Sequence, residues 1–200
     1  MKEYGRKAMR STSKLPDDYR EIFSVNLQTD KKIALLVNGI ALGIAALLAV
    51  PAHFVVPITT LFSMDDGIGM YFLRFLLLIL CSVAYIILHE AVHGVAMKIC
   101  GTKKVKYGFT GLYAFAGSDD FYGKGAYIFI ALAPVVLWGV VLGVITPLVS
   151  PAWFWVVYFI QITNLSGAAG DLYVTLKFAK MPRDILVSDS GVGMKVYSAE

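Results

Sequence analysis

The chain has 200 residues, of which 58% are hydrophobic and 16% are charged, and its mean hydropathy is +0.68. A soluble domain carries about 25% charged residues, so the composition argues against a soluble domain and indicates an integral membrane protein. The formal net charge of +4 is spread over a chain rich in apolar runs, which argues against a nucleic-acid-binding protein.

The first 32 residues are polar and carry more basic than acidic residues. They contain no apolar run, so they are not a cleavable signal peptide. A short helix starting near Pro16 would place its apolar side chains on one side, where they could lie on the membrane surface; these are Tyr19, Ile22 and Phe23. The alternative is a partly ordered tail. We interpret residues 1–32 as a polar cytoplasmic segment.

Four apolar segments follow, and each reaches the roughly 20 residues that a transmembrane helix needs. They form a core from 33 to 178, with spans at about 33–56, 71–100, 126–149 and 152–178. Residues 103–117 alternate aromatic with small or polar residues, a pattern that predicts a β-hairpin. The polar tail, residues 179–200, predicts a second small hairpin. The expected fold is an all-α membrane protein of about four transmembrane helices with a small cytoplasmic β-hairpin.

Lysine and arginine concentrate in the N-terminal segment, in the connection 101–126 and in the C-terminal tail. The other two connections contain neither residue type. With four spans, all the basic segments fall on one side of the bilayer, and their charge marks that side as cytoplasmic. Three spans would place basic segments on both sides. We therefore expect a multi-pass protein of the cell membrane with both termini in the cytoplasm.

The second span contains a His-Glu-x-x-His motif, formed by His89, Glu90 and His93. Two histidines four residues apart lie on one helical face and can bind one zinc ion, while the glutamate between them can act as general base. Ionisable groups inside a span are costly, so they are functional candidates by default. Catalytic zinc takes three protein ligands, and a third is therefore needed at the same depth.

Asp171 is the candidate third ligand, because it lies about as far from the inner end of its span as the histidines do from theirs. His53 lies near the outer end of the first span, too far across the bilayer. The alternative for Asp171 is a buried carboxylate that bonds a neighbouring polar side chain. Asn164, two turns earlier on the same face, could bind the substrate backbone, or it could join helices instead.

This combination of residues resembles the site-2 protease family of intramembrane zinc peptidases, which pairs His-Glu-x-x-His in one span with Asn and a later Asp in another. The segment from Ala131 to Pro134 resembles a proline-containing element of that family. The chain departs from the family pattern because Asp171 is followed by Leu172 rather than glycine. The larger proteases also carry domains that this chain lacks, so their substrate choice is not transferred.

The chain more closely resembles a family of small bacterial membrane proteins described as zincin peptidases. The resemblance covers the segment from Leu15 to Tyr19, the HEAVHG core, the aromatic hairpin and the segment from Asn164 to Asp171. It implies that Glu90 is the catalytic glutamate and that zinc is bound by His89, His93 and Asp171.

We therefore expect a zinc-dependent intramembrane or membrane-proximal peptidase that hydrolyses peptide bonds with zinc-activated water and Glu90 as general base. Its partners would be the lipid bilayer and a membrane protein or peptide substrate, which the hairpin 103–117 could hold as an added strand. One alternative is a catalytically inactive zincin-like membrane protein that acts as a structural or accessory subunit. A metal-handling membrane protein is another, but it would need more ligands along a path than three histidines supply.

Overall fold

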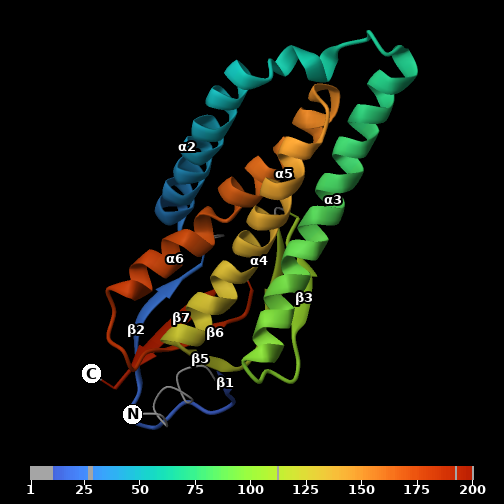
Figure 1. Ribbon diagram of the computed structural model, residues 1–200. Helices are drawn as coiled ribbons and strands as arrows, with labels where there is room; N and C mark the ends of the chain where they lie inside the picture. Colours follow the sequence, from blue (N-terminus) through green and yellow to red (C-terminus); the bar gives the residue numbers. More distant parts are fainter. Residues whose placement is uncertain (1–10, 27–28, 112, 192, 200) are drawn as a thin grey trace. The chain divides into compact units, whose positions relative to one another are not determined.

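The structure is a computed structural model that describes residues 11–26, 29–111, 113–191 and 193–199. These residues are mostly helical and include five α-helices: α2 (Lys31–Val55), α3 (Ile68–Ile99), α4 (Lys124–Ile145), α5 (Pro151–Gly167) and α6 (Ala169–Ala179) (Figure 1). Two short 3-10 helices follow α2 and α4: η1 (Ile58–Phe62) and η2 (Thr146–Leu148). Its strands are β1 (Ser11–Thr12), β2 (Arg20–Val25), β3 (Lys106–Phe109), β4 (Ala114–Gly117), β5 (Phe121–Gly123), β6 (Leu186–Asp189) and β7 (Met194–Ser198).

The contacts within the chain divide it into two compact units, and the division falls inside continuous helices. The sheet unit comprises Met1–Leu36, Glu90–Pro134 and Asp171–Glu200, and the helical unit comprises Val37–His89 and Val135–Gly170. Helix α3 passes from the helical unit into the sheet unit between His89 and Glu90.

Three helices in the described part of the chain are long and apolar enough to cross a membrane. They are Lys31–Val55, Ile68–Ile99 and the continuous stretch Lys124–Leu148. Large apolar side chains on the first two face outward, with Leu47, Phe54 and Ile79 exposed by 73%, 82% and 61%. Surfaces of this kind are stable when lipid or another protein covers them. The prediction of an apolar, helical membrane protein is therefore supported for the first three spans.

The fourth predicted span, 152–178, is not one helix, and this prediction is corrected. Helix α5 ends at Gly167 and α6 begins at Ala169, with Ala168 between them at φ −76° and ψ 10° (Figure 1). Gly167 and Gly170 flank the break, and each glycine disfavours a helix by about 1 kcal/mol relative to alanine. The break places Asp171 in the first turn of α6 rather than in the middle of a long helix.

A five-stranded antiparallel sheet, in the order β1-β5-β6-β7-β2, is the main correction to the all-α prediction. It takes strands from the N-terminal segment, from the connection before α4 and from the C-terminal tail. The tail hairpin is confirmed, because β6 pairs with β7 from Leu186↔Tyr197 to Asp189↔Met194. The helix predicted after Pro16 is wrong, since residues 20–25 form strand β2 against β7. Residues 1–10 of that segment lie outside the described part.

The hairpin predicted within 103–117 is confirmed as a separate two-stranded sheet, in which β3 pairs with β4 from Lys106↔Gly117 to Phe109↔Ala114. Its turn is closed by Thr110, whose N–H donates to the Tyr113 carbonyl at 3.0 Å. Gly111 lies in this turn at φ +89°, a conformation that glycine adopts without strain.

Each unit has its own core. In the sheet unit the buried residues include Tyr122, Phe178, Val187 and Val196. In the helical unit Trp155 is 1% exposed, and its indole N–H donates to the Val56 carbonyl at 3.0 Å. Both cores therefore hold the helices that carry the motif residues.

Candidate metal centre

The structure brings together the three residues named as zinc ligands. His93 and Asp171 both belong to the sheet unit, and His93 Nε2 lies 3.8 Å from Asp171 Oδ2. His89 lies one turn before His93 on the continuous helix α3. Each of the three offers one ligand atom, and these atoms all lie within 4.8 Å of one another. That spacing is small enough for one metal ion.

His53 is not part of this group. It lies in the last turn of α2, and its Nδ1 accepts a hydrogen bond from the Ile58 backbone N–H at 3.1 Å. This contact satisfies a backbone N–H at the start of η1, so His53 links the end of α2 to the next element.

The position of Asp171 suits a negatively charged ligand. The first turn of a helix carries unpaired N–H groups and the positive end of the helix dipole, and both stabilise a carboxylate. The prediction of one uninterrupted span over 152–178 does not account for this stabilisation. The break at Ala168 therefore supplies a physical reason for an ionised aspartate at this depth.

His93 is oriented by a main-chain carbonyl. Its Nδ1 lies 2.9 Å from the Ile130 oxygen on α4. A carbonyl oxygen only accepts, so the imidazole must donate a proton from Nδ1. In the neutral ring this leaves Nε2, the atom that faces Asp171, unprotonated and able to bind a metal.

His89 is oriented by side chains of the helical unit. The Tyr85 hydroxyl donates to Asn164 Oδ1 at 2.9 Å, and the same oxygen lies 2.8 Å from His89 Nδ1. Because the tyrosine proton is directed to Asn164, His89 donates from Nδ1 to the tyrosine oxygen. His89 thus takes the same tautomer as His93, with an unprotonated Nε2.

Asn164 was predicted to bind substrate or to join helices, and its contacts favour the second interpretation. It is fully buried, its oxygen accepts from Tyr85, and its nitrogen donates to the Val135 carbonyl at 3.2 Å. Its side chain has no exposed surface at which a substrate could bind. Tyr85, which no prediction singled out, precedes His89 by one helical turn, so the spacing alone could have identified it.

Glu90 lies between the histidines but outside the group of three potential ligands. The backbone N–H of Ala116, on strand β4, interacts with its carboxylate. Hydrogen-bonded and non-hydrogen-bonded pairs alternate along the β3–β4 ladder, and the Thr110–Tyr113 pair is hydrogen-bonded, so the N–H of Ala116 lies on the edge of β4 that faces away from β3. The predicted general base therefore lies next to the hairpin that follows the motif.

Asp189 is a second carboxylate near this centre, and sequence reasoning missed it. It accepts hydrogen bonds from the Tyr127 hydroxyl and from the Gly191 N–H, the latter at 2.7 Å. Burial raises the pKa of Asp189, while these two hydrogen bonds oppose the rise. Its charge acts on both Asp171 and Glu90. It lies at the end of β6, in a tail that carries no local motif.

The donor set fits zinc. Two neutral imidazoles and one carboxylate are the ligands of many catalytic zinc sites, which keep a fourth position for water. The 3.8 Å between His93 Nε2 and Asp171 Oδ2 is too long for a hydrogen bond. It is close to the separation of about 3.3 Å that two ligands have on one tetrahedral zinc ion with bonds near 2.0 Å.

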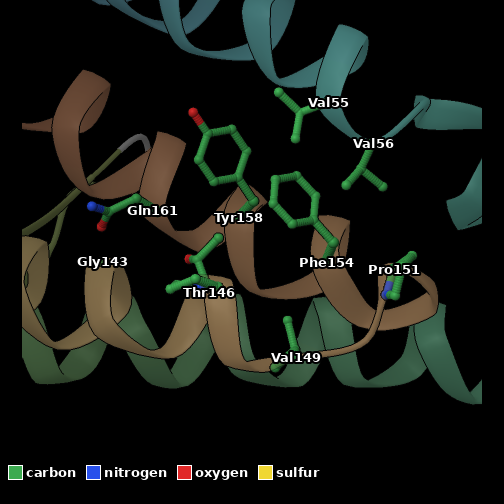
Figure 2. A pocket seen from close by; sticks show the side chains of 10 residues that line it. Val55, Val56, Gly143, Thr146, Val149, Pro151, Phe154, Tyr158 and Gln161 are labelled. Atoms are coloured by element: carbon green, nitrogen blue, oxygen red, sulfur yellow. The ribbon is translucent and has the colours of Figure 1, made fainter.

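A pocket of about 390 Å³ in the helical unit is not part of the candidate centre (Figure 2). It is lined by the end of α2, the end of α4 with η2, and α5, including Val55, Phe154, Tyr158 and Gln161. No histidine, aspartate or glutamate lines it. Its lining offers neither a metal ligand nor a proton acceptor of the kind that the motif supplies.

Comparison with known proteins supports the coarse assignment. One curated relative, an uncharacterized 24.7 kDa protein from Pyrococcus woesei, is 32% identical over 123 residues. These residues make up 59% of this chain and 53% of the relative, so the match spans about half the relative's length. No solved structure matches. A family profile described as "Putative zincin peptidase" matches residues 82–186, which is 105 of the 200 residues and includes His89, His93 and Asp171. The chain therefore belongs to the family that carries this description.

Proposed function

We propose that this chain is a zinc-dependent peptidase that cleaves peptide bonds within or next to the membrane. The observation that carries the proposal is the group of three ligand atoms within 4.8 Å of one another. Glu90 is next to His89 in the chain but is not part of this group. Membership of a zincin peptidase family supports the same reaction class. When bound, zinc lowers the pKa of a water molecule toward about 7 and polarises the substrate carbonyl.

The chain's own residues then handle the protons. Glu90 accepts a proton at its carboxylate and returns it to the leaving amine. The Ala116 N–H interacts with this carboxylate. His89 and His93 each carry a proton at Nδ1, which His89 donates to the Tyr85 oxygen and His93 donates to the Ile130 carbonyl. Neither Nδ1 atom can therefore accept the proton of the water, and Glu90 accepts it.

Strand β4 is the proposed holding site for substrate. A transmembrane helix hides its carbonyls in its own hydrogen bonds, so it must unwind before cleavage. An unwound segment can pair with a sheet edge through main-chain hydrogen bonds. On the outer edge of β4, the N–H of Ala116 interacts with Glu90, and the N–H and C=O groups of Ala114 can pair with a substrate strand. Pairing along this edge would bring a substrate carbonyl next to the general base.

The sheet supports a four-crossing topology with both termini in the cytoplasm. Strands from before α2, from between α3 and α4, and from after α6 pair in one sheet, so these segments lie on one side of the membrane. Helices α2, α3 and α4 are long and apolar enough for three crossings. An odd number of crossings would not return the chain to that side, so we assign the fourth crossing to α5 and α6 together. The basic residues of these segments mark the cytoplasmic side.

The direct test is cleavage by purified protein in lipid nanodiscs, with a membrane-anchored peptide that contains a helix-destabilised segment. Wild type should cleave the peptide, and a chelator should stop it. Glu90→Gln should keep zinc and lose activity by about 100-fold to 10,000-fold, the range for general acid–base catalysis. Zinc binding without Glu90-dependent cleavage would instead identify a catalytically inactive, accessory member of the family.

A further inference from the structure

We infer that Pro134 is a positioning residue that fixes the tautomer of His93 by releasing the Ile130 carbonyl from the α4 hydrogen-bond ladder. This inference rests on the proposed zinc site, because it concerns how one of the ligands is prepared. Pro134 lies inside α4, ten residues after its first residue, Lys124. It touches neither the substrate nor the reacting atoms in this assignment.

The first step is the hydrogen-bond pattern of the helix. In an α-helix each backbone N–H donates to the carbonyl four residues earlier. Proline has no backbone N–H, so residue 134 cannot donate to the carbonyl of Ile130. The sequence therefore singles out one carbonyl of α4 that needs a different donor.

The second step is the identity of that donor. His93 Nδ1 lies 2.9 Å from the Ile130 oxygen, and Ile130 is only 2% exposed. A polar group left unsatisfied inside a membrane is costly, and little water reaches this position. The released carbonyl and the imidazole N–H therefore satisfy each other, which makes the Nδ1–H tautomer of His93 the stable one.

Helix α2 provides an internal comparison. Pro51 lies inside α2 and releases the carbonyl of Leu47 in the same way. Leu47 lies in a part of α2 whose side chains face outward, and it is 73% exposed. A Pro51→Ala substitution thus repeats the chemical change of Pro134→Ala in another membrane helix, away from the three candidate ligands.

The experiment measures the tautomer and the metal affinity of Pro134→Ala against wild type and Pro51→Ala. The restored N–H can donate to Ile130 and compete with His93. Nitrogen-15 NMR of histidine-labelled, metal-free protein should show one Nδ1–H signal for His93 in wild type and a mixture of tautomers in Pro134→Ala. Chelator competition should show zinc binding weakened by about tenfold, the lower end of the range for residues that orient metal ligands.

Pro51→Ala should leave both readouts unchanged. An unchanged tautomer and an unchanged zinc affinity in Pro134→Ala would overturn the inference. If Pro134→Ala fails to fold, Pro134→Gly also restores the N–H while keeping the helix flexible, and the same criteria apply. Should wild type bind no zinc, the proposed function fails, but the tautomer of the metal-free protein still decides the role of Pro134.

Discussion

The two units of this protein orient their candidate metal-binding histidines by different means. In the helical unit, His89 is oriented by a chain of side chains, from Tyr85 to Asn164 and on to the Val135 carbonyl. In the sheet unit, His93 is oriented by one main-chain carbonyl, that of Ile130. Each side chain of a network can be removed by a single substitution. A main-chain carbonyl cannot be removed in this way, and only substitutions of neighbouring residues change its hydrogen bonds. The difference predicts which substitutions weaken zinc binding and by how much.

The largest loss of zinc binding should come from removing a candidate ligand, whether it belongs to the helical unit or to the sheet unit. His89→Ala and His93→Ala should each weaken zinc binding by more than the roughly 100-fold reached by changes in orienting residues. His53→Ala is the matched control, since His53 accepts from the Ile58 N–H and is outside the ligand group. Zinc titration with a chromophoric chelator measures all three. Equal affinity in wild type and His93→Ala would remove His93 from the site.

The next effect should follow from Tyr85→Phe, which removes the acceptor for the His89 Nδ1 proton. We expect zinc binding to weaken by about tenfold, within the range for residues that orient metal ligands. Tyr158→Phe is the control, because the Tyr158 hydroxyl donates to the Leu48 carbonyl in the same unit without touching a ligand. If both variants bind zinc as wild type does, the side-chain network does not orient His89.

A smaller effect on zinc is expected from Asn164→Ala. The Tyr85 oxygen remains beside His89, but its proton loses the Asn164 acceptor and can turn toward the imidazole. Zinc affinity should fall by less than in Tyr85→Phe. The free energy of unfolding should fall by about 1–3 kcal/mol, because the substitution leaves buried polar partners unsatisfied. A larger loss of zinc affinity than in Tyr85→Phe would contradict this order of importance.

The smallest effect on zinc should come from Gly117→Ala in the sheet unit. An added Cβ at Gly117 would lie 2.4 Å from the Ser190 carbonyl carbon, so the β6–β7 turn would have to shift. We expect destabilisation of about 1–3 kcal/mol, as for other overpacked positions. Zinc affinity should change little, because Asp189 is not one of the three ligands. Thermal unfolding and zinc titration of the same sample separate the two outcomes.

The candidate metal ligands could be predicted from the sequence better than the groups around them. The histidine spacing is local, and the depth of Asp171 follows from counting residues along two spans, so both could be predicted. The Ile130 carbonyl has no side-chain signature, and only the proline four residues later indicates it. Asp189 lies near the centre because β6 belongs to a sheet whose strands come from distant segments of the chain. No local sequence pattern predicts such pairing.

The errors in the fold have the same origin. The short helix considered after Pro16 would place Tyr19, Ile22 and Phe23 on one side, but residues 20–25 pair with β7 near the other end of the chain. That long-range pairing overrides local propensity. The break at Ala168 is concealed in the sequence because residues 152–178 are apolar over a length that suits one span, although glycines weaken the helix there.

The most direct test of the zinc centre is X-ray absorption at the zinc edge, measured on wild-type protein with its zinc content determined. Bound zinc should be stoichiometric, with nitrogen and oxygen ligands only and with the outer-shell scattering of two imidazoles. Asp171→Asn should weaken binding without changing the imidazole signal. Zinc bound through sulfur, or protein that holds no stoichiometric zinc, would contradict the assignment of His89, His93 and Asp171.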